Sequence, residues 1–598
     1  MADRDIELNI LNLKEDSLAH GSSYSMREPT YDMPRRKSGF TRFVDTFRRD
    51  PNSSIMPKDD DMPPHIREHQ GVHYFDFDAA AARTANSGLA RELKGRHLQM
   101  IAIGGSIGTG LFVASGKTLS TGGPASMLLA YCFVGVMLYC TVQALGELAV
   151  VFPVAGSFSA YSTRFLDPAW GFAMGWNYAL QWLVVLPLEI IAASMTITYW
   201  NPDVNKAVFV TIFLIVIITI NLFGIKGYGE AEFIFAIIKV TAVIGFILLG
   251  IVINIGGQPD TGYIGGRYWK DPGAFRNGFK GLCSVFVTAA FAFAGTELVG
   301  LAAAETANPR KSLPTAIKQV FWRITLFYVV ALALVGLLVP YTDERLLGAS
   351  TDSNASPFVI AIQDAGIDVL PSVMNAVIMI AVISVGNSSV FGSSRTLAAL
   401  ADQGQAPRIL GYVDRRGRPL VAILVASALG FLAYLSDIPQ QSDVMDWLLA
   451  VSALSSIFTW GSICLSHIRF RQAWAARGRS LNELAFRAQS GVLGSWLGFA
   501  LNAIVLVAQF WVGAWPVGYR DNTPGENAKN FFLQYMAVPI VAVFWLGYKL
   551  YFRTSVVRVE DMDIDTGRRE LNLPILLAQE QDEKRSWPLW KRVYRFMC

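Results

Sequence analysis

The sequence predicts an all-α polytopic membrane protein with twelve transmembrane helices. Of its 598 residues, 52% are hydrophobic and only 16% are charged, whereas ordinary soluble domains carry about 25% charged residues. Apolar stretches recur along the chain, and each is long enough to cross a hydrocarbon core about 30 Å thick. The predicted spans are residues 98–117, 124–151, 172–199, 207–224, 231–255, 280–303, 316–340, 371–400, 419–436, 443–466, 494–516 and 531–551.

Polar segments flank these spans at both ends of the chain. Residues 1–96 are rich in Ser, Pro, Arg and Asp and lack hydrophobic periodicity, which predicts a largely disordered tail. The twelve-helix domain is expected at 97–551 and a second polar tail at 552–598. The net charge of +4 gives no reason to expect a nucleic-acid partner. Because the sequence shows no zinc-type spacing, Walker loop, nucleophile elbow or HExxH motif, we expect no metal, no cofactor and no enzymatic activity.

Basic residues in the short loops predict the orientation. The loops "DRRGRP" at 414–419 and "RFRQAWAARGR" at 469–479 are rich in arginine. Both lie on the side that is cytoplasmic if the N-terminus is inside. We therefore expect both tails to be cytoplasmic.

The first span contains an unusual run of glycines, "IAIGGSIGTG" at 101–110. Glycine in the middle of a helix costs roughly 1 kcal/mol relative to alanine, and non-helical backbone is tolerated in a membrane only where it lines a cavity or is buried in protein. Unwinding around 106–110 would expose N–H groups that bind an anion and carbonyls that bind a cation. An α-amino acid carries both charges on one carbon. The alternative is close helix packing through the spacing of Gly104 and Gly108.

The sixth span repeats this pattern with "TAAFAFAGTE" at 288–297. It is again an apolar helix with small residues and a glycine near mid-depth. If spans 1 and 6 each open a set of five, the odd number inverts the second set relative to the first. Interrupted helices at matching positions of two halves point to the binding site of a transporter.

Several motifs resemble the fungal amino-acid permeases, a family of the amino acid–polyamine–organocation superfamily that includes the general amino-acid permeases. They cover residues 94–598 and include "RHLQMIAIGGSIGTGLF", "LGELAVVFPVAGSF", "FGIKGYGEAEF", "CSVFVTAAFAFAGTELVGLAAAE", "ISVGNSSVFGSSR" and "YVDRRGRPL". The resemblance implies a LeuT-like fold, with two inverted five-helix repeats, broken helices 1 and 6, and two further helices. It also implies proton-coupled uptake of L-amino acids, with broad range, at the plasma membrane.

In span 1 the motif "GTGLF" matches the carboxylate-binding turn of that family. The resemblance assigns the substrate carboxylate to the N–H groups of Thr109 and Gly110, which follow Gly108. It assigns the substrate ammonium to the carbonyl of Ser106.

In span 6 the motif "FAFAGTE" matches the second helix break. The resemblance assigns a share of the ammonium to the carbonyls of Phe291 and Ala294, with the Phe291 ring as an aromatic gate. Thr296 and Glu297 complete the candidate substrate site here. Many relatives have Ser or Gly where this chain has Ala292 and Ala294, which leaves the selectivity open.

Ionisable residues inside a membrane are costly and are functional candidates by default. Lys239 lies within "FAIIKVTAVIGF" of span 5, and we expect it to couple protons to transport by donating to a freed carbonyl of span 1. The alternatives are a snorkelling lysine or a permanent salt bridge. Glu297 is a second proton-coupling candidate, although a structural hydrogen-bonded carboxyl fits equally well.

Other polar residues of the spans are weaker candidates. Glu189 in span 3 follows Pro187 and is expected to face the substrate amine. Asn387 and Ser388 in span 8 are expected to line the side-chain pocket, with helix–helix hydrogen bonding as the alternative. Glu147 and Arg395, near the inner ends of spans 2 and 8, are interpreted as parts of a cytoplasmic gate or a structural network.

The tails carry candidate regulatory positions. Cys598, among basic and aromatic residues, suits S-palmitoylation and hence contact with the bilayer, although an unmodified tail is the alternative. Lys14 is a candidate ubiquitin acceptor for ligase adaptors. The acidic run "EDMDID" at 560–565 resembles a signal for export machinery, or is simply a solvated acidic segment.

Two other functions stay open at this point. A nutrient receptor would bind amino acids with little flux. A permease with a narrow range, or one for polyamines, would need a different pocket, and a polyamine site should offer more carboxylates.

Overall fold

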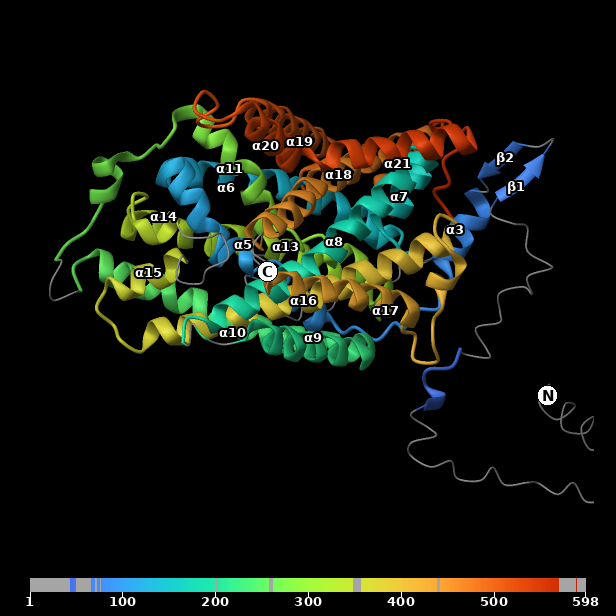
Figure 1. The fold of residues 1–598 in the computed structure, drawn as a ribbon. Coiled ribbons are helices and arrows are strands. Elements are labelled where there is room, and N and C mark those ends of the chain that lie inside the picture. Colours follow the sequence, from blue (N-terminus) through green and yellow to red (C-terminus); the bar gives the residue numbers. More distant parts are fainter. Residues whose placement is uncertain are drawn as a thin grey trace, which may run out of the picture. The chain divides into compact units, whose positions relative to one another are not determined.

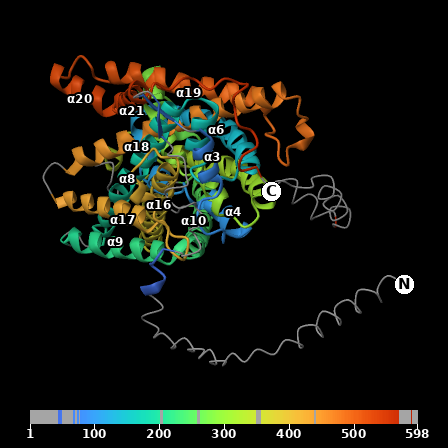
Figure 2. The same ribbon diagram turned by 90° about the vertical axis from the view of Figure 1, so that its right-hand side faces the viewer.

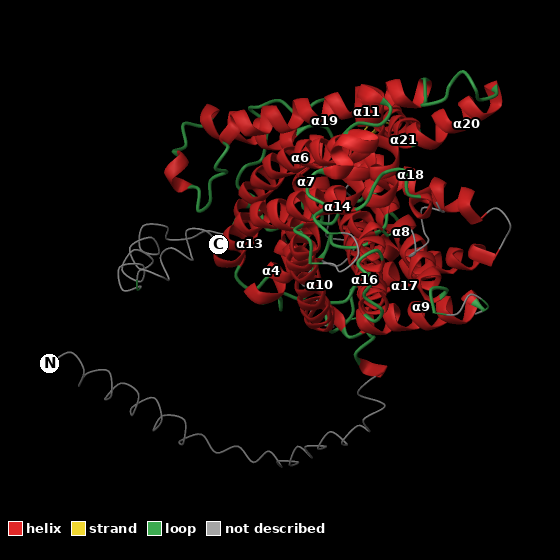
Figure 3. Ribbon diagram, turned by 90° about the vertical axis from the view of Figure 1, so that its left-hand side faces the viewer, coloured by secondary structure: helices red, strands yellow, loops and turns green. Residues whose placement is uncertain are grey.

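The computed structural model describes residues 44–49, 66–69, 72–75, 77–200, 203, 205–257, 262–347, 356–437, 441–568 and 588. The chain forms two units, residues 1–46 and 47–598, and the fold described below is that of the second unit. Helices make up most of its regular structure (Figure 1, Figure 3). The strands β1 (Ile66–His69) and β2 (Val72–Phe75) pair as a short antiparallel hairpin.

The helices of the first half precede residue 306. They are α3 (Phe77–Ala85), α4 (Gly95–Gly104), α5 (Thr109–Phe112), α6 (Ala114–Val151), α7 (Phe158–Phe165), α8 (Pro168–Ile197), α9 (Lys206–Leu222), α10 (Gly224–Asn254), α11 (Gly278–Phe293) and α12 (Leu298–Ala302). The helices of the second half are α13 (Pro309–Arg323), α14 (Ala331–Leu338), α15 (Pro357–Gln363), α16 (Leu370–Asp402), α17 (Leu420–Leu429), α18 (Gln441–Ala476), α19 (Gly491–Ala514), α20 (Pro524–Tyr535) and α21 (Ala537–Phe552). A π-helical turn, Ile324–Val330, joins α13 to α14.

The structure is that of a polytopic helical membrane protein. Among the described residues, eight helices are long and apolar enough to cross a membrane, and the pair α20 and α21, bent by 59°, would make a ninth span. The predicted spans 207–224 and 419–436 correspond to shorter apolar helices, Lys206–Leu222 and Leu420–Leu435. Exposed large apolar side chains gather on the outward faces of α9, α10, α19 and α21, as expected where a surface contacts lipid.

The boundary between the first two predicted spans differs from the expectation. The first span is predicted to end at residue 117 and the second to begin at 124, but α6 runs from Ala114 to Val151. A kink at Gly123, where φ is +80°, replaces the predicted loop. Glycine adopts this left-handed conformation without a steric penalty, and Pro124 then restarts the helix with its fixed φ.

Described parts of both predicted tails pack on the helical domain. In the N-terminal tail, α3 forms a helix, and the Leu93 N–H donates to the Glu305 carbonyl at 3.0 Å. In the C-terminal tail, the Val557 N–H donates to the Leu166 carbonyl at 2.8 Å, and Met562 and Ile564 are fully buried. The domain limits drawn from hydropathy at 97 and 551 therefore leave out segments that the fold holds in place.

The helix packing places the candidate site at the centre of the unit. Helix α8 lies along α16, α6 along α11, and α10 along α4. Figures 1 and 2 show α9 on one side of the bundle and α19 to α21 on the opposite side. The short helices α4, α5, α11 and α12 are thereby enclosed by longer ones.

Candidate substrate and ion site

The helical conformation of the glycine-rich segment is interrupted. Helix α4 ends at Gly104 and α5 begins at Thr109. As at any helix start, the first N–H groups lack an intrahelical acceptor, and within the described part of the chain no backbone acceptor pairs with the N–H of Thr109 or Gly110. A Cβ at Gly110 would lie 2.3 Å from the Ala292 Cα. Glycine is therefore required here because α5 and α11 touch through their backbones.

A second interruption lies against the first. Helix α11 ends at Phe293 and α12 begins at Leu298. Between them Gly295 has φ of +96°, and a Cβ on it would lie 2.8 Å from the Gly105 carbonyl oxygen. Two helix interruptions that lie against each other bring N–H and C=O groups without intrahelical partners into one place.

Tyr328, in the π-helical turn, bridges both interruptions, and the sequence analysis missed it. Its hydroxyl lies 3.1 Å from the Ser106 carbonyl, 2.8 Å from the Ala292 carbonyl and 3.0 Å from the Ser106 hydroxyl. The Ser106 carbonyl, expected to bind an ammonium, thus has a hydroxyl partner here. The Phe291 carbonyl also has a partner, because it accepts from the Ala294 N–H at 3.1 Å. The π-helical turn that carries Tyr328 is a feature frequent at functional sites, and it is visible only in the structure.

Glu189 reaches the first interruption from α8. The Thr109 hydroxyl donates to Glu189 Oε2 at 2.5 Å. Its other oxygen, Oε1, is buried and has no hydrogen-bond partner among the described residues. A buried carboxylate oxygen without a donor is costly, so this oxygen is suited to a cationic ligand.

Glu297 is tied into the second interruption by three donors. The Gly295 N–H, the Tyr178 hydroxyl and the Trp460 indole N–H each lie 3.2 Å from a carboxylate oxygen. These contacts join α12 to α8 and α18. These hydrogen bonds do not distinguish the two expected roles of Glu297, proton coupling and a structural hydrogen-bonded carboxyl.

A buried arginine, absent from the sequence analysis, also holds the two interruptions together. Arg323 donates to the Ala102 carbonyl at the end of α4 and to the Thr296 hydroxyl between α11 and α12. Thr296 in turn donates to the Phe293 carbonyl at 2.8 Å. Thr296 therefore connects the helix end to Arg323 through its side chain.

Lys239, on α10, contacts the last residue of α4. Its Nζ donates to the Gly104 carbonyl at 2.8 Å and to the Ser384 hydroxyl at 2.7 Å. It makes no direct ion pair in the described part of the chain. The Ser384 hydroxyl donates to Glu232 Oε2 at 2.8 Å. The predicted span 231–255 placed Glu232 at its very start, at the edge of the membrane, whereas α10 begins at Gly224 and Glu232 is fully buried.

Comparison with known proteins identifies the family of this chain. The family model "Amino acid permease" matches residues 97–560. The chain belongs to the amino acid permease family. A general amino-acid permease of Candida albicans is 58% identical over 569 residues, covering 94% of each chain. A general amino-acid permease of Saccharomyces cerevisiae is 50% identical over 609 residues, covering 98% of each chain.

Two further matches are a relative with a different substrate in its name and a solved structure. An S-adenosylmethionine permease of C. albicans is 52% identical to this permease over 588 residues, covering 96% of this chain and 93% of that one. Among solved structures, a manganese transporter of Eremococcus coleocola aligns with a TM-score of 0.46 at 13% identity, covering 80% of this chain and 95% of that one.

The permease uses Asn387 and Ser388 in contacts between helices. Asn387 Nδ2 donates to Glu232 Oε1 at 3.0 Å, and its Oδ1 accepts from Asn221 at 2.9 Å. Ser388 Oγ lies 3.1 Å from the Tyr228 hydroxyl. These partners favour the helix–helix alternative for both residues over a role in lining a side-chain pocket.

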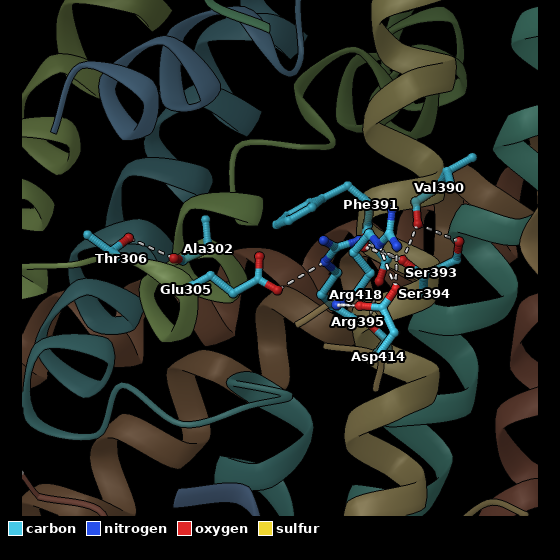
Figure 4. A network of polar contacts seen from close by, with 12 residues as sticks. Ala302, Glu305, Thr306, Val390, Phe391, Ser393, Ser394, Arg395, Asp414 and Arg418 are labelled. Carbon is cyan, nitrogen blue, oxygen red and sulfur yellow. Dashed lines mark hydrogen bonds and ion pairs between the residues drawn. The ribbon is translucent and has the colours of Figure 1, made fainter. Parts of the chain in front are cut away.

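Arg395 and Glu147 form direct ion pairs. Arg395 Nε lies 3.2 Å from Glu305 Oε1, and in Figure 4 the Glu305 carboxylate points at the Arg395 guanidinium. Glu147 lies 3.1 Å from His467 Nε2 and 2.5 Å from Arg471 Nε. These pairs match the structural network expected for Glu147 and Arg395.

Part of the acidic run at 560–565 contacts the rest of the protein. Lys14 and Cys598 lie outside the described residues. Asp565 pairs with Arg479 at 2.5 Å. Burial alone would raise the pKa of the Asp563 carboxyl, but the nearby Arg164 and the backbone N–H groups of Thr566 and Asp565 hold this pKa below its ordinary value. The run is therefore more than a solvated acidic segment.

Proposed function

We propose that this permease carries L-amino acids into the cell by proton symport across the plasma membrane, with a broad substrate range. The proposal includes twelve spans in a LeuT-like arrangement of two inverted five-helix repeats plus two helices. Broken span 1 is α4 with α5, and broken span 6 is α11 with α12. One observation carries it: the two interruptions face each other, and Lys239 binds the Gly104 carbonyl where α4 ends.

The substrate's charged groups would bind mainly to backbone. Its carboxylate is assigned to the N–H groups of Thr109 and Gly110, which follow Gly108 at the positive end of α5. Its ammonium is assigned to the carbonyls of Ser106, Phe291 and Ala294. Because the Tyr328 hydroxyl already contacts the Ser106 carbonyl, the ammonium must displace or share this contact.

The side chains around this backbone site have distinct proposed roles. The unpaired Glu189 Oε1 is suited to help hold the ammonium, and the Phe291 ring would cover the bound substrate as a gate. Thr296 and Glu297 would keep the second interruption in shape. Asn387 and Ser388 would act through helix contacts.

Proton coupling is assigned to Lys239. When charged, the lysine holds the Gly104 carbonyl with a charge-assisted hydrogen bond, which is stronger than the bond from a neutral amine. A change in protonation would thus alter the anchoring of α4 next to the carboxylate-binding turn. Glu297 remains the second candidate, although its three donors already satisfy its oxygens.

The broad range follows from backbone recognition. Ala292 and Ala294 add no polar side chain to the second interruption, so little in this region selects between substrate side chains. The relatives fit this reading, since their printed substrates are amino acids in general and S-adenosylmethionine, a molecule that also has an α-amino-acid end. A narrower range and an amino-acid-sensing receptor with limited transport are the alternatives.

The test is uptake by the purified permease in sealed vesicles with an imposed inward proton gradient. We expect labelled neutral amino acid to accumulate, to stop accumulating when a protonophore collapses the gradient, and to be competed by most of the twenty L-amino acids. Binding without accumulation would favour the receptor. Competition by only a few amino acids would establish a narrow range, and competition by spermidine alone would overturn the amino-acid site.

The tails and the orientation are part of the same proposal. We place both termini in the cytoplasm, with Cys598 as a palmitoylated anchor to the bilayer and Lys14 as a ubiquitin acceptor recognised through ligase adaptors. The acidic run at 560–565 would be read by export machinery.

A further inference from the structure

A buried carboxylate lies close to Lys239 and has no role in the proposed binding of substrate. Glu232 and Lys239 are seven residues apart on α10, and this spacing of two turns puts both side chains on one face of the helix. Both residues are fully buried. Ser384, on α16, lies between them.

Two successive hydrogen bonds join these three residues in one direction, from Lys239 to Glu232. Lys239 Nζ donates to Ser384 Oγ at 2.7 Å, and Ser384 Oγ donates to Glu232 Oε2 at 2.8 Å. The hydroxyl accepts on one side and donates on the other, which is the geometry in which a proton can be passed along. A direct salt bridge between Lys239 and Glu232 would not need the hydroxyl and would hold both charges fixed.

We propose that Glu232 exchanges the coupling proton with Lys239 through the Ser384 hydroxyl. This inference rests on the proposed proton symport and names the partner of its lysine. In the step, an N–H bond of the Lys239 ammonium breaks as a new O–H bond forms on Ser384. At the same time the original Ser384 O–H bond breaks and an O–H bond forms on Glu232 Oε2. The products are a neutral amine and a neutral carboxylic acid, so no charge or electron is left over.

The second oxygen of Glu232 is held by an amide. This oxygen, Oε1, accepts from Asn387 Nδ2 at 3.0 Å, and Asn387 is itself fixed by Asn221 at 2.9 Å. The amide of Asn387 is thereby oriented with its donor toward the carboxylate. Asn387 is therefore a positioning residue, which explains why a polar residue of α16 faces α10 rather than the interruptions.

Neutralisation of the pair lowers an electrostatic cost. Two unpaired charges buried away from water are expensive, and their attraction offsets the cost only when they are in close contact. Here the hydroxyl keeps them apart, so the charged and neutral forms of the pair are both accessible. The neutral amine then binds the Gly104 carbonyl more weakly, and the end of α4 is released.

Other titratable groups lie around the hydrogen bonds that join Lys239, Ser384 and Glu232. On α10 itself Tyr228 lies one turn before Glu232, with its hydroxyl 3.1 Å from Ser388 and its ring stacked on Phe391 at 4.4 Å. Beyond it, the ion pair of Arg395 with Glu305 faces the end of the bundle. From α8, Glu189 faces the lysine.

The experiment compares substitutions at Ser384 in the vesicle assay, with uptake and proton entry recorded together and exchange of labelled for unlabelled substrate measured without a gradient. Ser384→Ala removes the hydroxyl, and Ser384→Thr keeps it. We expect Ser384→Ala to lose gradient-driven uptake by about 100-fold, the size of effect that a positioned proton-transfer group contributes, and to keep exchange. Ser384→Thr should restore driven uptake.

Glu232→Gln, which keeps the shape of the side chain, should behave like Ser384→Ala. The matched control is Ser393→Ala on the same helix, because Ser393 donates only to carbonyls of its own helix. It should leave both measurements unchanged. If Glu232→Gln fails to reach the membrane, the comparison of Ser384→Ala with Ser384→Thr still tests the relay.

The outcomes separate this inference from the proposed function. Proton-coupled uptake at the wild-type rate in Ser384→Ala overturns the relay but leaves Lys239 as the coupling residue. Coupled accumulation in Lys239→Ala removes the lysine from the mechanism, and the relay with it. If Ser384→Ala loses both exchange and uptake and Ser384→Thr restores neither, the serine is needed for packing, and this outcome overturns the relay.

Discussion

Two buried polar clusters contain the same kinds of groups but connect them differently. In one cluster, the Ser384 hydroxyl links Lys239 to Glu232 by two hydrogen bonds. Toward one end, Glu147 is held directly by Arg471 at 2.5 Å and also accepts from the Ala488 N–H at 2.7 Å. The central cluster can change its charges by moving a proton, whereas the arginine at the end stays charged at any accessible pH.

The difference shows that burial of a charge is not by itself a sign of function. At the end cluster the Glu147 carboxylate contacts Arg471 and His467 directly, which is the arrangement of a structural ion pair between α6 and α18. At the centre Lys239 contacts a backbone carbonyl and the Ser384 hydroxyl, and Glu232 contacts that same hydroxyl and the Asn387 amide. The proposed relay thus differs from the ion pair in that a hydroxyl stands between its charged groups.

The largest effect is expected at the turn beside the central cluster. Gly110→Val should abolish uptake, because a Cβ at this position would lie 2.3 Å from the Ala292 Cα and would force the two interruptions apart. Uptake should be normalised to the amount of protein at the cell surface. The control is Gly245→Val on α10, where a Cβ would meet nothing within 4 Å. Wild-type kinetics in Gly110→Val would refute the site.

Lys239→Ala should have the next largest effect. The variant should lose accumulation driven by a proton gradient and retain exchange of labelled for unlabelled substrate, because binding rests mainly on backbone groups of the interruptions. Lys239→Arg should also fail to accumulate substrate, since a guanidinium does not give up its proton. Accumulation in step with proton entry in Lys239→Ala would make the lysine structural and Glu297 the leading carrier.

A substitution in the end cluster should lower the stability of the protein and leave proton coupling unchanged. Glu147→Gln leaves Arg471 and His467 without their carboxylate, and breaking a buried pair in this way costs about 3 kcal/mol. We expect a lower thermal unfolding midpoint for the purified protein, with proton-coupled uptake per folded molecule close to wild type. If uptake became uncoupled while the midpoint stayed unchanged, the contrast between the two clusters would be wrong.

The smallest effect on transport is expected at the end of the chain, remote from both clusters. Cys598→Ser should lose hydroxylamine-sensitive lipid labelling if this cysteine is acylated. Uptake per molecule at the surface should change little. Equal labelling of the wild-type protein and the variant would exclude palmitoylation at this position.

Much of the site could be predicted from short-range features of the sequence. The glycines at 104–110 and the "FAFAGTE" segment predicted where helices would end, because glycine's conformational freedom is a local property of the chain. Lys239 was identified because a lysine in an apolar stretch is costly wherever it lies. Glu232, Arg323 and Tyr328 were missed, since hydropathy gives no information on which face of a span a polar residue occupies or what it meets there.

The sequence by itself determined that this is a helical membrane protein of the permease family, because length, apolar composition and ordered motifs are properties of the chain alone. Only the tertiary structure decided how the polar residues are used. Ser384 and Glu232 are 152 positions apart, and Ser106 and Tyr328 are 222 apart. Their contacts arise from the packing of α10 against α16 and of the two interruptions against each other. Such contacts depend on the relative placement of whole helices, which no local pattern of residues specifies.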